Sequence, residues 1–413
     1  MKEGYFMKGF ITAIVLLISP LSYSLDIHLD PEATPGEYQA LLKKMSSQKF
    51  LGKKDNSIED AIRYGNRLSS WLKVINETRT SETSIKLTTA QNRGSGVPIE
   101  KPYTYSPKIV ETKLNELKGV LDPQIKDVIF NNTPYTAHLN ISDEKFVEQA
   151  RKLYGIYSMA ARYKLLNPSR ELLVGQERRD VRGYYYLTKN KINADVLKGF
   201  NNFPSDKKEE TIDALIKICQ NDWKSRKSCD KKVQAAIKKN DLASHYKKYF
   251  PIAENNWDTF FKIKKDARRS DIVWGDTQTT IPFKTPHSQA VKDFVRNNIE
   301  DEYRFKEWNL VLQFYYSGPY IEFRKGVTPH VDRLGGDRIV MDENSSLDEF
   351  DSQWTLRHEF GHVLGLPDCY HEFYDTKIEA YVNYQIDVTD LMCSRSGNMN
   401  ERIFQELKRT YKK

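Results

Sequence analysis

Two histidines and a glutamate stand close together near the C-terminal end of the chain, in the stretch His358-Glu359-Phe360-Gly361-His362. Residues four apart lie on one face of a helix, so a helix here would direct both imidazoles at a single metal ion. Glu359 would then reach a water molecule beside that ion and act as a general base. In a chain with only 8 His among 413 residues, chance produces this pattern in roughly one case per hundred. The pattern therefore predicts metal-dependent hydrolysis.

The residues after this pattern supply a third candidate ligand. Gly365 follows His362 by three residues and Asp368 follows Gly365 by three, which gives His-Glu-x-x-His-x-x-Gly-x-x-Asp. A helix that carries two ligands cannot supply a third from its next turn, so the chain must bend, and glycine accepts the positive φ of such a helix end. Pro367 prevents the helix from resuming. The bend would bring Asp368 to the metal and leave the fourth position to water, as in catalytic zinc sites.

The sequence before the motif predicts a sheet and then the helix that carries the ligands. Three segments rich in β-branched and aromatic residues are predicted strands, at residues 309–316, 320–325 and 337–341, and residues 288–302 are a predicted helix. Ser346 with Glu349 three residues later has the pattern of a capping box, which predicts the start of the motif helix. A mixed sheet that leads into an amphipathic helix is the setting that the ligand pattern requires.

The segment from His358 to Asp368, together with Met392 in Asp390-Leu391-Met392-Cys393, resembles the metzincin clan of zinc peptidases. The aspartate in place of the usual third histidine is similar to the snapalysin-type subgroup. The resemblance covers about the last third of the chain. It implies zinc (Zn²⁺) held by His358, His362 and Asp368, Glu359 as the general base, and a turn containing Met392 beneath the metal.

The expected fold class is α+β, with a mainly helical N-terminal region followed by a metzincin-like catalytic domain with a mixed twisted sheet and an active-site helix. The sequence divides into a signal peptide at 1–24, a helical region with a linker at 25–105, a helical domain at 106–265 and the catalytic domain at 266–413. Predicted helices lie at 36–50, 57–77, 145–166, 207–220 and 231–250, and residues 88–107 have a linker composition. The helical half is expected to be a propeptide or an accessory domain.

Two other residues compete with Asp368 for the role of third ligand. His371 lies close by, and Glu379 resembles the glutamate ligand of the thermolysin-like peptidases, which follows the histidine pair by a helix-sized gap. Asp368 is the favoured ligand because it alone explains Gly365 and Pro367 together. The sequence leaves open which residue would stabilise an oxyanion, with four tyrosines as candidates: Tyr370, Tyr374, Tyr381 and Tyr384. We expect strand 337–341 to be the sheet edge that binds an extended substrate, and residues 369–391 to form most of the specificity pocket.

The N-terminus has the pattern of a secretory signal, with Lys2 and Lys8 before a short apolar run and a small-residue site near Ser24. The apolar run is too short to span a membrane, so the protein is expected to be secreted or periplasmic without stable membrane insertion. Four cysteines in an oxidising compartment predict disulfides, which we pair locally as Cys219–Cys229 and Cys369–Cys393. By the metzincin resemblance, the second bond would join the third ligand to the methionine turn.

The formal net charge of +8 arises from 64 Lys and Arg against 56 Asp and Glu. The basic clusters recur at helical spacing without a nucleic-acid motif, so we expect solvated helix faces and no nucleic-acid partner. The expected function is metalloendopeptidase action on a protein or peptide substrate. Two alternatives stay open at this point, a zinc hydrolase acting on cell-wall amides and a catalytically inactive zinc-binding module. Oligomeric state is not predicted.

Overall fold

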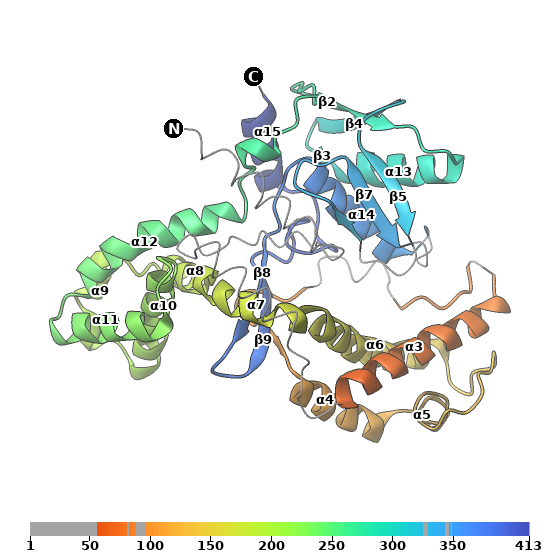
Figure 1. Ribbon diagram of the computed structural model, residues 1–413, viewed down its shortest axis with the longest axis horizontal. Coiled ribbons are helices and arrows are strands. Elements are labelled where there is room, and N and C mark those ends of the chain that lie inside the picture. The colour runs from red at the N-terminus through yellow and green to blue at the C-terminus, as the bar shows by residue number, and fades with distance from the viewer. Residues whose placement is uncertain are drawn as a thin grey trace, which may run out of the picture.

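The computed structural model describes residues 56–80, 82–87, 96–324, 329–342, 347 and 349–412 (Figure 1). The predicted signal peptide at 1–24 and the predicted helix at 36–50 lie outside these residues. The described chain combines many helices with three small sheets, so the predicted mixture of helix and sheet is confirmed. Within the described residues, every helix is too short or too polar to cross a bilayer.

A first helical unit is formed from both sides of the predicted boundary near residue 105. Apolar faces of its helices share one core, in which Trp71, Val110 and Phe146 are fully buried. This core contains residues from both of the predicted ranges 25–105 and 106–265, because helices on either side of residue 105 cover each other's apolar faces. These helices are α3 (Asn56–Glu77), α4 (Pro107–Val120), α5 (Pro123–Phe130) and α6 (Asp143–Leu166).

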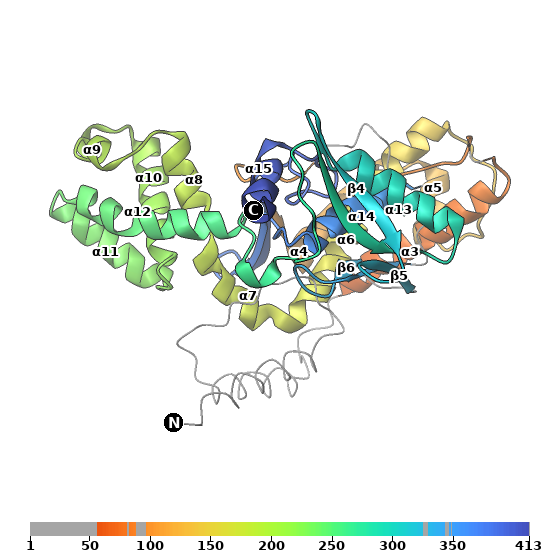
Figure 2. The ribbon, with the colours of Figure 1, turned by 90° about the horizontal axis from the view of Figure 1, so that it is seen from above.

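A second helical unit with its own core projects to the left in Figure 1 and in the view from above in Figure 2. The predicted Cys219–Cys229 disulfide is confirmed, and both of its cysteines are buried in this core. The single helix predicted at 231–250 was wrong: Asn240 has a φ of +52°, which ends one helix, and Asp241 caps the next. The helices are α8 (Arg182–Lys189), α9 (Ala194–Leu197), α10 (Ser205–Gln220), α11 (Arg226–Lys238) and α12 (Leu242–Thr259), and α7 (Arg170–Gln176) connects them to the first unit.

Two three-stranded sheets and the helices against them form the unit that carries the ligand motif. Strand β2 (Gln278–Lys284) runs parallel to β4 (Trp308–Tyr315), which also pairs with β3 (Arg304–Phe305). Strand β7 (Arg338–Asp342) lies between parallel β5 (Tyr320–Arg324) and antiparallel β6 (His330–Val331). The backbone N–H of Lys284 donates to the carbonyl of Pro319 at 2.7 Å, which joins the two sheets. Packed against them are α13 (Gln289–Glu302), α14 (Phe350–Val363) and α15 (Glu401–Tyr411).

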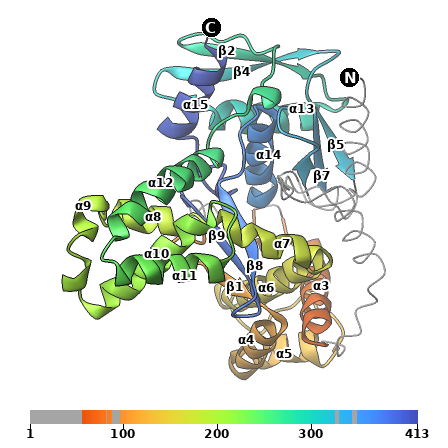
Figure 3. The same cartoon turned by 60° about the vertical axis from the view of Figure 1, so that its left-hand side comes forward.

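The third sheet connects the ligand-bearing unit to the first helical unit. Its order is β1 (Tyr103–Tyr105), β9 (Ala380–Gln385) and β8 (Tyr370–Asp375), all antiparallel, and Figure 3 shows the β8–β9 hairpin beside β1. Tyr374 and Tyr381 of the hairpin are buried in the core of α3 to α6. The predicted linker 88–107 therefore contains a paired strand, because the three residues of β1 find their hydrogen-bond partners in a hairpin far along the chain.

The ligand-bearing helix α14 begins later than the capping-box pattern predicts. Glu349 is the residue before the helix and has an extended backbone, with φ −72° and ψ 134°, so it cannot belong to the first turn. The helix starts at Phe350, three residues after the predicted start, and Ser346 lies outside the described residues. The prediction of a helix over the motif is confirmed, whereas its start was wrong.

Candidate metal centre

Helix α14 holds the two motif histidines at fixed positions in the interior. It is buried on nearly all sides and packs against α13, β6 and β7. The side chains of His358 and His362 are each 5% exposed, and their spacing of four residues places them on one face. A helix enclosed in this way offers little freedom for either imidazole to change its direction.

The chain bends at Gly365 as the sequence pattern predicts. This residue has a φ of +82°, and its N–H donates to the carbonyl of His362 at 2.9 Å. The next N–H, that of Leu366, donates to the carbonyl of Gly361 at 3.0 Å, which completes a helix end that uses the left-handed conformation. A Cβ on residue 365 would also lie 2.6 Å from the carbonyl oxygen of Ala267, so glycine is required for two reasons. The bend turns the chain back toward the helix and delivers Asp368.

Asp368 lies beside both imidazoles. Its Oδ1 atom is 3.1 Å from Nε2 of His358 and 3.3 Å from Nε2 of His362. One ligand atom from each of the three residues lies within 4.8 Å of the others. Two nitrogens and one carboxylate oxygen that converge in this way form a donor set suited to zinc, with a position left for a further ligand.

The opposite ring nitrogen of each histidine is held by a backbone carbonyl. Nδ1 of His358 lies 2.7 Å from the carbonyl oxygen of Leu391, and Nδ1 of His362 lies 2.8 Å from that of Leu366. Each Nδ1 must carry the proton that it donates, so in the neutral ring the lone pair is on Nε2. Both lone pairs then face a carboxylate oxygen, which calls for a cation between them. The donor set therefore fits a divalent metal through Nε2, Nε2 and Oδ1.

The electrostatics without a metal show how strongly these groups interact. Burial lowers the pKa of His362, but the charge and hydrogen bond of Asp368 outweigh it and raise that pKa to about 9. Burial raises the pKa of Asp368, but the two histidines outweigh it and hold the pKa of this carboxyl well below its usual range. The metal-free site thus retains a proton in the place where a cation would bind.

Met392 packs against helix α14 at Gly361, a residue that lies between the two histidines in the sequence. It is completely buried, and a Cβ added to Gly361 would overlap its sulfur and lie 2.9 Å from its methyl carbon. The N–H of Cys369, next to Asp368, donates to the carbonyl of Met392 at 3.0 Å. The predicted disulfide between Cys369 and Cys393 is confirmed, so the bend and this turn are joined by a covalent bond.

Asp390 anchors the turn from below, and sequence reasoning missed it. It is fully buried, and its carboxylate accepts the N–H of Met392 at 2.8 Å and the amide of Asn400 at 2.6 Å. Arg402 on α15 also donates to it. Asp390 stands two residues before Met392, the spacing of an Asx turn, and this was the signal that could have found it.

A cleft of about 640 Å³ contains the three candidate ligands and Glu359. The edge strand along it is β6, whereas β7, which the sequence predicts to be the edge, lies in the middle of its sheet. That prediction was wrong because the two-residue strand β6 is too short to show an alternating pattern. Of the predicted pocket range 369–391, the structure places Tyr370, Glu372, Asn383 and Gln385 in the cleft wall.

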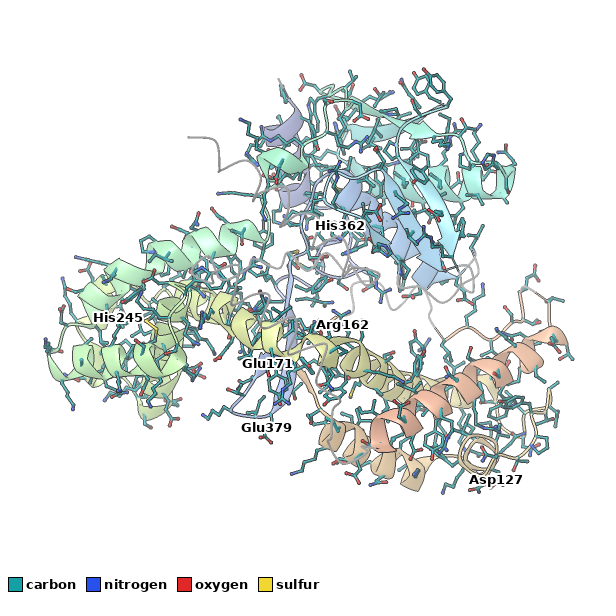
Figure 4. The ribbon with its side chains drawn as sticks, in the orientation of Figure 1. Asp127, Arg162, Glu171, His245, His362 and Glu379 are labelled. Atoms are coloured by element: carbon teal, nitrogen blue, oxygen red, sulfur yellow. A yellow bond between two sulfur atoms is a disulfide. The ribbon has the colours of Figure 1, made fainter. Side chains whose placement is uncertain are left out.

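The competing ligands lie elsewhere. His371 is buried with its Nε2 atom 2.9 Å from the carbonyl oxygen of Gln176, and burial lowers its pKa to about 3. Glu379 is exposed at the tip of the β8–β9 hairpin, away from His362 in Figure 4. Of the four candidate tyrosines, Tyr370 alone lines the cleft. The other three pack in cores of the protein.

The other wall of the cleft comes from residues more than 190 positions earlier in the chain. It includes Tyr105 on β1 and Met159 and Arg162 on α6. Sequence reasoning missed these residues, and no local pattern could have found them. The pairing of β1 with β9 and the packing of the β8–β9 hairpin in the core of α3 to α6 bring them to the site.

Comparison with models of protein families, with curated proteins and with solved structures finds no match.

Proposed function

We propose that this protein is an exported zinc-dependent peptidase with a metzincin-like site, in which His358, His362 and Asp368 hold the ion and Glu359 is the general base. The convergence of two Nε2 atoms and one Oδ1 atom, with both Nδ1 atoms held by backbone carbonyls, carries the proposal. The two disulfides support export to an oxidising compartment.

When bound, zinc supplies the Lewis acidity that polarises a scissile carbonyl and makes water a nucleophile near neutral pH. The chain's own groups supply the rest. Glu359 lines the same cleft on the same helix as the histidines, where its carboxylate accepts a proton from the attacking water and passes it to the leaving amine. A site of purely structural zinc has no use for this carboxylate, since such sites are closed by four protein ligands.

Strand β6 supports a peptide as the substrate. It is the outer strand of its sheet, and His330 and Val331 line the cleft beside the candidate ligands. An extended peptide laid along this edge would add its backbone hydrogen bonds to the sheet. Strand addition requires a regular amide backbone, so this feature favours a peptide over a cell-wall amide.

The decisive experiment combines metal analysis with proteolysis. We expect the purified protein to contain one equivalent of zinc, to digest casein and to lose activity after chelation. Glu359→Gln should lose at least a hundredfold in kcat while it keeps the zinc. Glu379→Gln is the matched control, because Glu379 is exposed on the hairpin tip.

Three results would contradict the proposal in different ways. Casein digestion that persists in Glu359→Gln would refute the mechanism. Zinc binding without hydrolysis of any peptide would favour an inactive zinc-binding module. Hydrolysis of cell-wall fragments but of no peptide would favour an amidase with the same metal centre.

A further inference from the structure

Helix α6 of the first helical unit forms the wall of the cleft that faces the candidate metal ligands. Ser158, Met159, Ala161, Arg162 and Leu165 line the cleft together with Glu359. Figure 4 shows Arg162 on this side, with His362 in the unit above. A substrate over the metal would therefore contact α6 directly, so the N-terminal half takes part in the site itself.

Arg162 is held in place by a buried cluster that joins three elements. Its Nε atom donates to both carboxylate oxygens of Glu372 on β8 at 3.1 Å, and its Nη2 atom donates to the same carboxylate. The hydroxyl of Tyr105 on β1 donates to the same carboxylate. The arginine side chain is 23% exposed whereas that of Glu372 is 4% exposed. Both charged side chains line the cleft, and the arginine is the more exposed of the two.

The other charged side chains that line the cleft also favour an acidic substrate over a basic one. Among the described lining residues, the acidic ones are Glu359, Asp368 and Glu372. The first two belong to the candidate metal site and the third is covered by Arg162 and Tyr105. Arg395 lines the cleft as well, with 52% of its side chain exposed and its Nη1 atom 3.9 Å from the carboxylate of Asp351. Among the described lining residues, the one carboxylate outside the metal site is already bound by Arg162, so a substrate lysine or arginine would have to compete for it. A substrate carboxylate would meet the guanidinium groups of Arg162 and Arg395.

We propose that Arg162 is a specificity residue that selects peptides with an acidic side chain close to the scissile bond and disfavours those with a basic one. The inference rests on the proposed peptidase function. Leu165 on the same helix contacts the aliphatic part of that side chain, and Arg162 contacts its carboxylate. Glu372 and Tyr105 are positioning residues, because they act by orienting Arg162.

The test compares matched quenched-fluorescence peptides that differ only by Glu or Lys at each of the three positions on either side of the cleaved bond. We expect the wild-type protein to show at least a tenfold higher kcat/KM for the Glu peptide at one position. Arg162→Lys should retain part of this preference. The double variant R162M/E372Q removes the cation without leaving a buried, unpaired carboxylate. In this variant the kcat/KM values of the Glu and Lys peptides should lie within twofold of each other, with the change in KM rather than in kcat.

Two further measurements separate recognition from folding. In the inactive Glu359→Gln background, Kd for the Glu peptide should rise at least fivefold when R162M/E372Q is added, with zinc content and thermal midpoint unchanged. Arg151→Met is the matched control, because Arg151 lies on the same helix but donates to the carbonyl of Leu87 at 2.6 Å, outside the cleft.

The outcomes are distinguishable. Cleavage by the wild-type protein with a preference that R162M/E372Q leaves unchanged, or a wild-type preference for Lys, would overturn this inference alone. Failure of the zinc-loaded wild-type protein to cleave any peptide would overturn the proposed function and this inference with it.

Discussion

Replacement of Gly361 by alanine tests the packing of the candidate metal centre most directly. Gly361 lies on α14 between the two histidines, and its missing side chain leaves the space that Met392 fills. A Cβ there would lie 2.9 Å from Cε of Met392 and 3.0 Å from the hydroxyl oxygen of Tyr303, besides overlapping the methionine sulfur. Ordinary contact between carbon atoms is about 3.5 to 4.0 Å. The fully buried methionine must therefore move by roughly 1 Å or push the helix away.

The expected magnitude follows from two opposing effects. Overpacking of a buried core costs about 1–3 kcal/mol, whereas alanine in place of glycine inside a helix stabilises by about 1 kcal/mol. We expect Gly361→Ala to lower the free energy of unfolding by about 0–2 kcal/mol, the difference between the two. It should also weaken zinc binding at least tenfold, because movement of the helix separates the Nε2 atoms of His358 and His362 from Asp368.

Met392→Ala supplies the partner for a double-mutant cycle. Alone it leaves a cavity and should cost about 2–5 kcal/mol, but in G361A/M392A the new methyl group enters space that the methionine has vacated. We expect a favourable coupling of about 1–3 kcal/mol, measured by urea denaturation with the m value checked for constancy. The zinc affinity, measured by competition with a chelator, should recover in the double variant.

Gly155→Ala is the control for helix propensity. Gly155 is an exposed residue within α6, and a Cβ there meets nothing within 4 Å. This variant should stabilise the protein by about 0.5–1 kcal/mol and leave zinc affinity unchanged. Strictly additive effects of Gly361→Ala and Met392→Ala would refute the packing argument, as would a Gly361→Ala variant as stable as Gly155→Ala.

Three other predictions concern the surroundings of the site. The free energy of unfolding of C369S/C393S should be about 3 kcal/mol lower, because the disulfide closes a loop of 24 residues. This variant should also bind zinc more weakly in chelator competition, and an unchanged affinity would show that Asp368 needs no covalent support. Burial lowers the pKa of His371 from 6.5 to about 3, so between pH 6.5 and pH 3 the unfolded chain binds a proton that the folded chain does not. The free energy of unfolding should therefore fall by about 1.4 kcal/mol for each unit by which the pH decreases in this range. His371→Gln should flatten this slope in urea titrations, and an equally steep slope would assign the loss to other groups. N-terminal sequencing of the active protein should show residues 97–166 retained, since Val97 lines the cleft and β1 pairs with β9; an active form that begins after Leu166 would identify the helical half as a propeptide.

Local sequence rules were sufficient to predict the backbone conformation of the segment that carries the candidate ligands. The spacing of His358 and His362 predicts a shared helical face, and Gly365 predicts the bend, because both depend on backbone geometry within a few residues. The structure has that helix, a φ of +82° at Gly365 and an aspartate beside both imidazoles. The disulfide partners were also predicted correctly, since each pair joins segments that are close in the sequence.

Tertiary structure decided the features that depend on pairing between distant segments. The three residues of β1 have no partner within their own region, so their role appears only when β9 supplies the hydrogen bonds. The edge position of β6 likewise follows from strand order, which a two-residue strand cannot encode in an alternating pattern. Arg162 and Glu372 are 210 residues apart, and nothing near either one specifies the other. The sequence by itself thus determined the candidate metal ligands, whereas the cleft around them exists only because separate cores pack together.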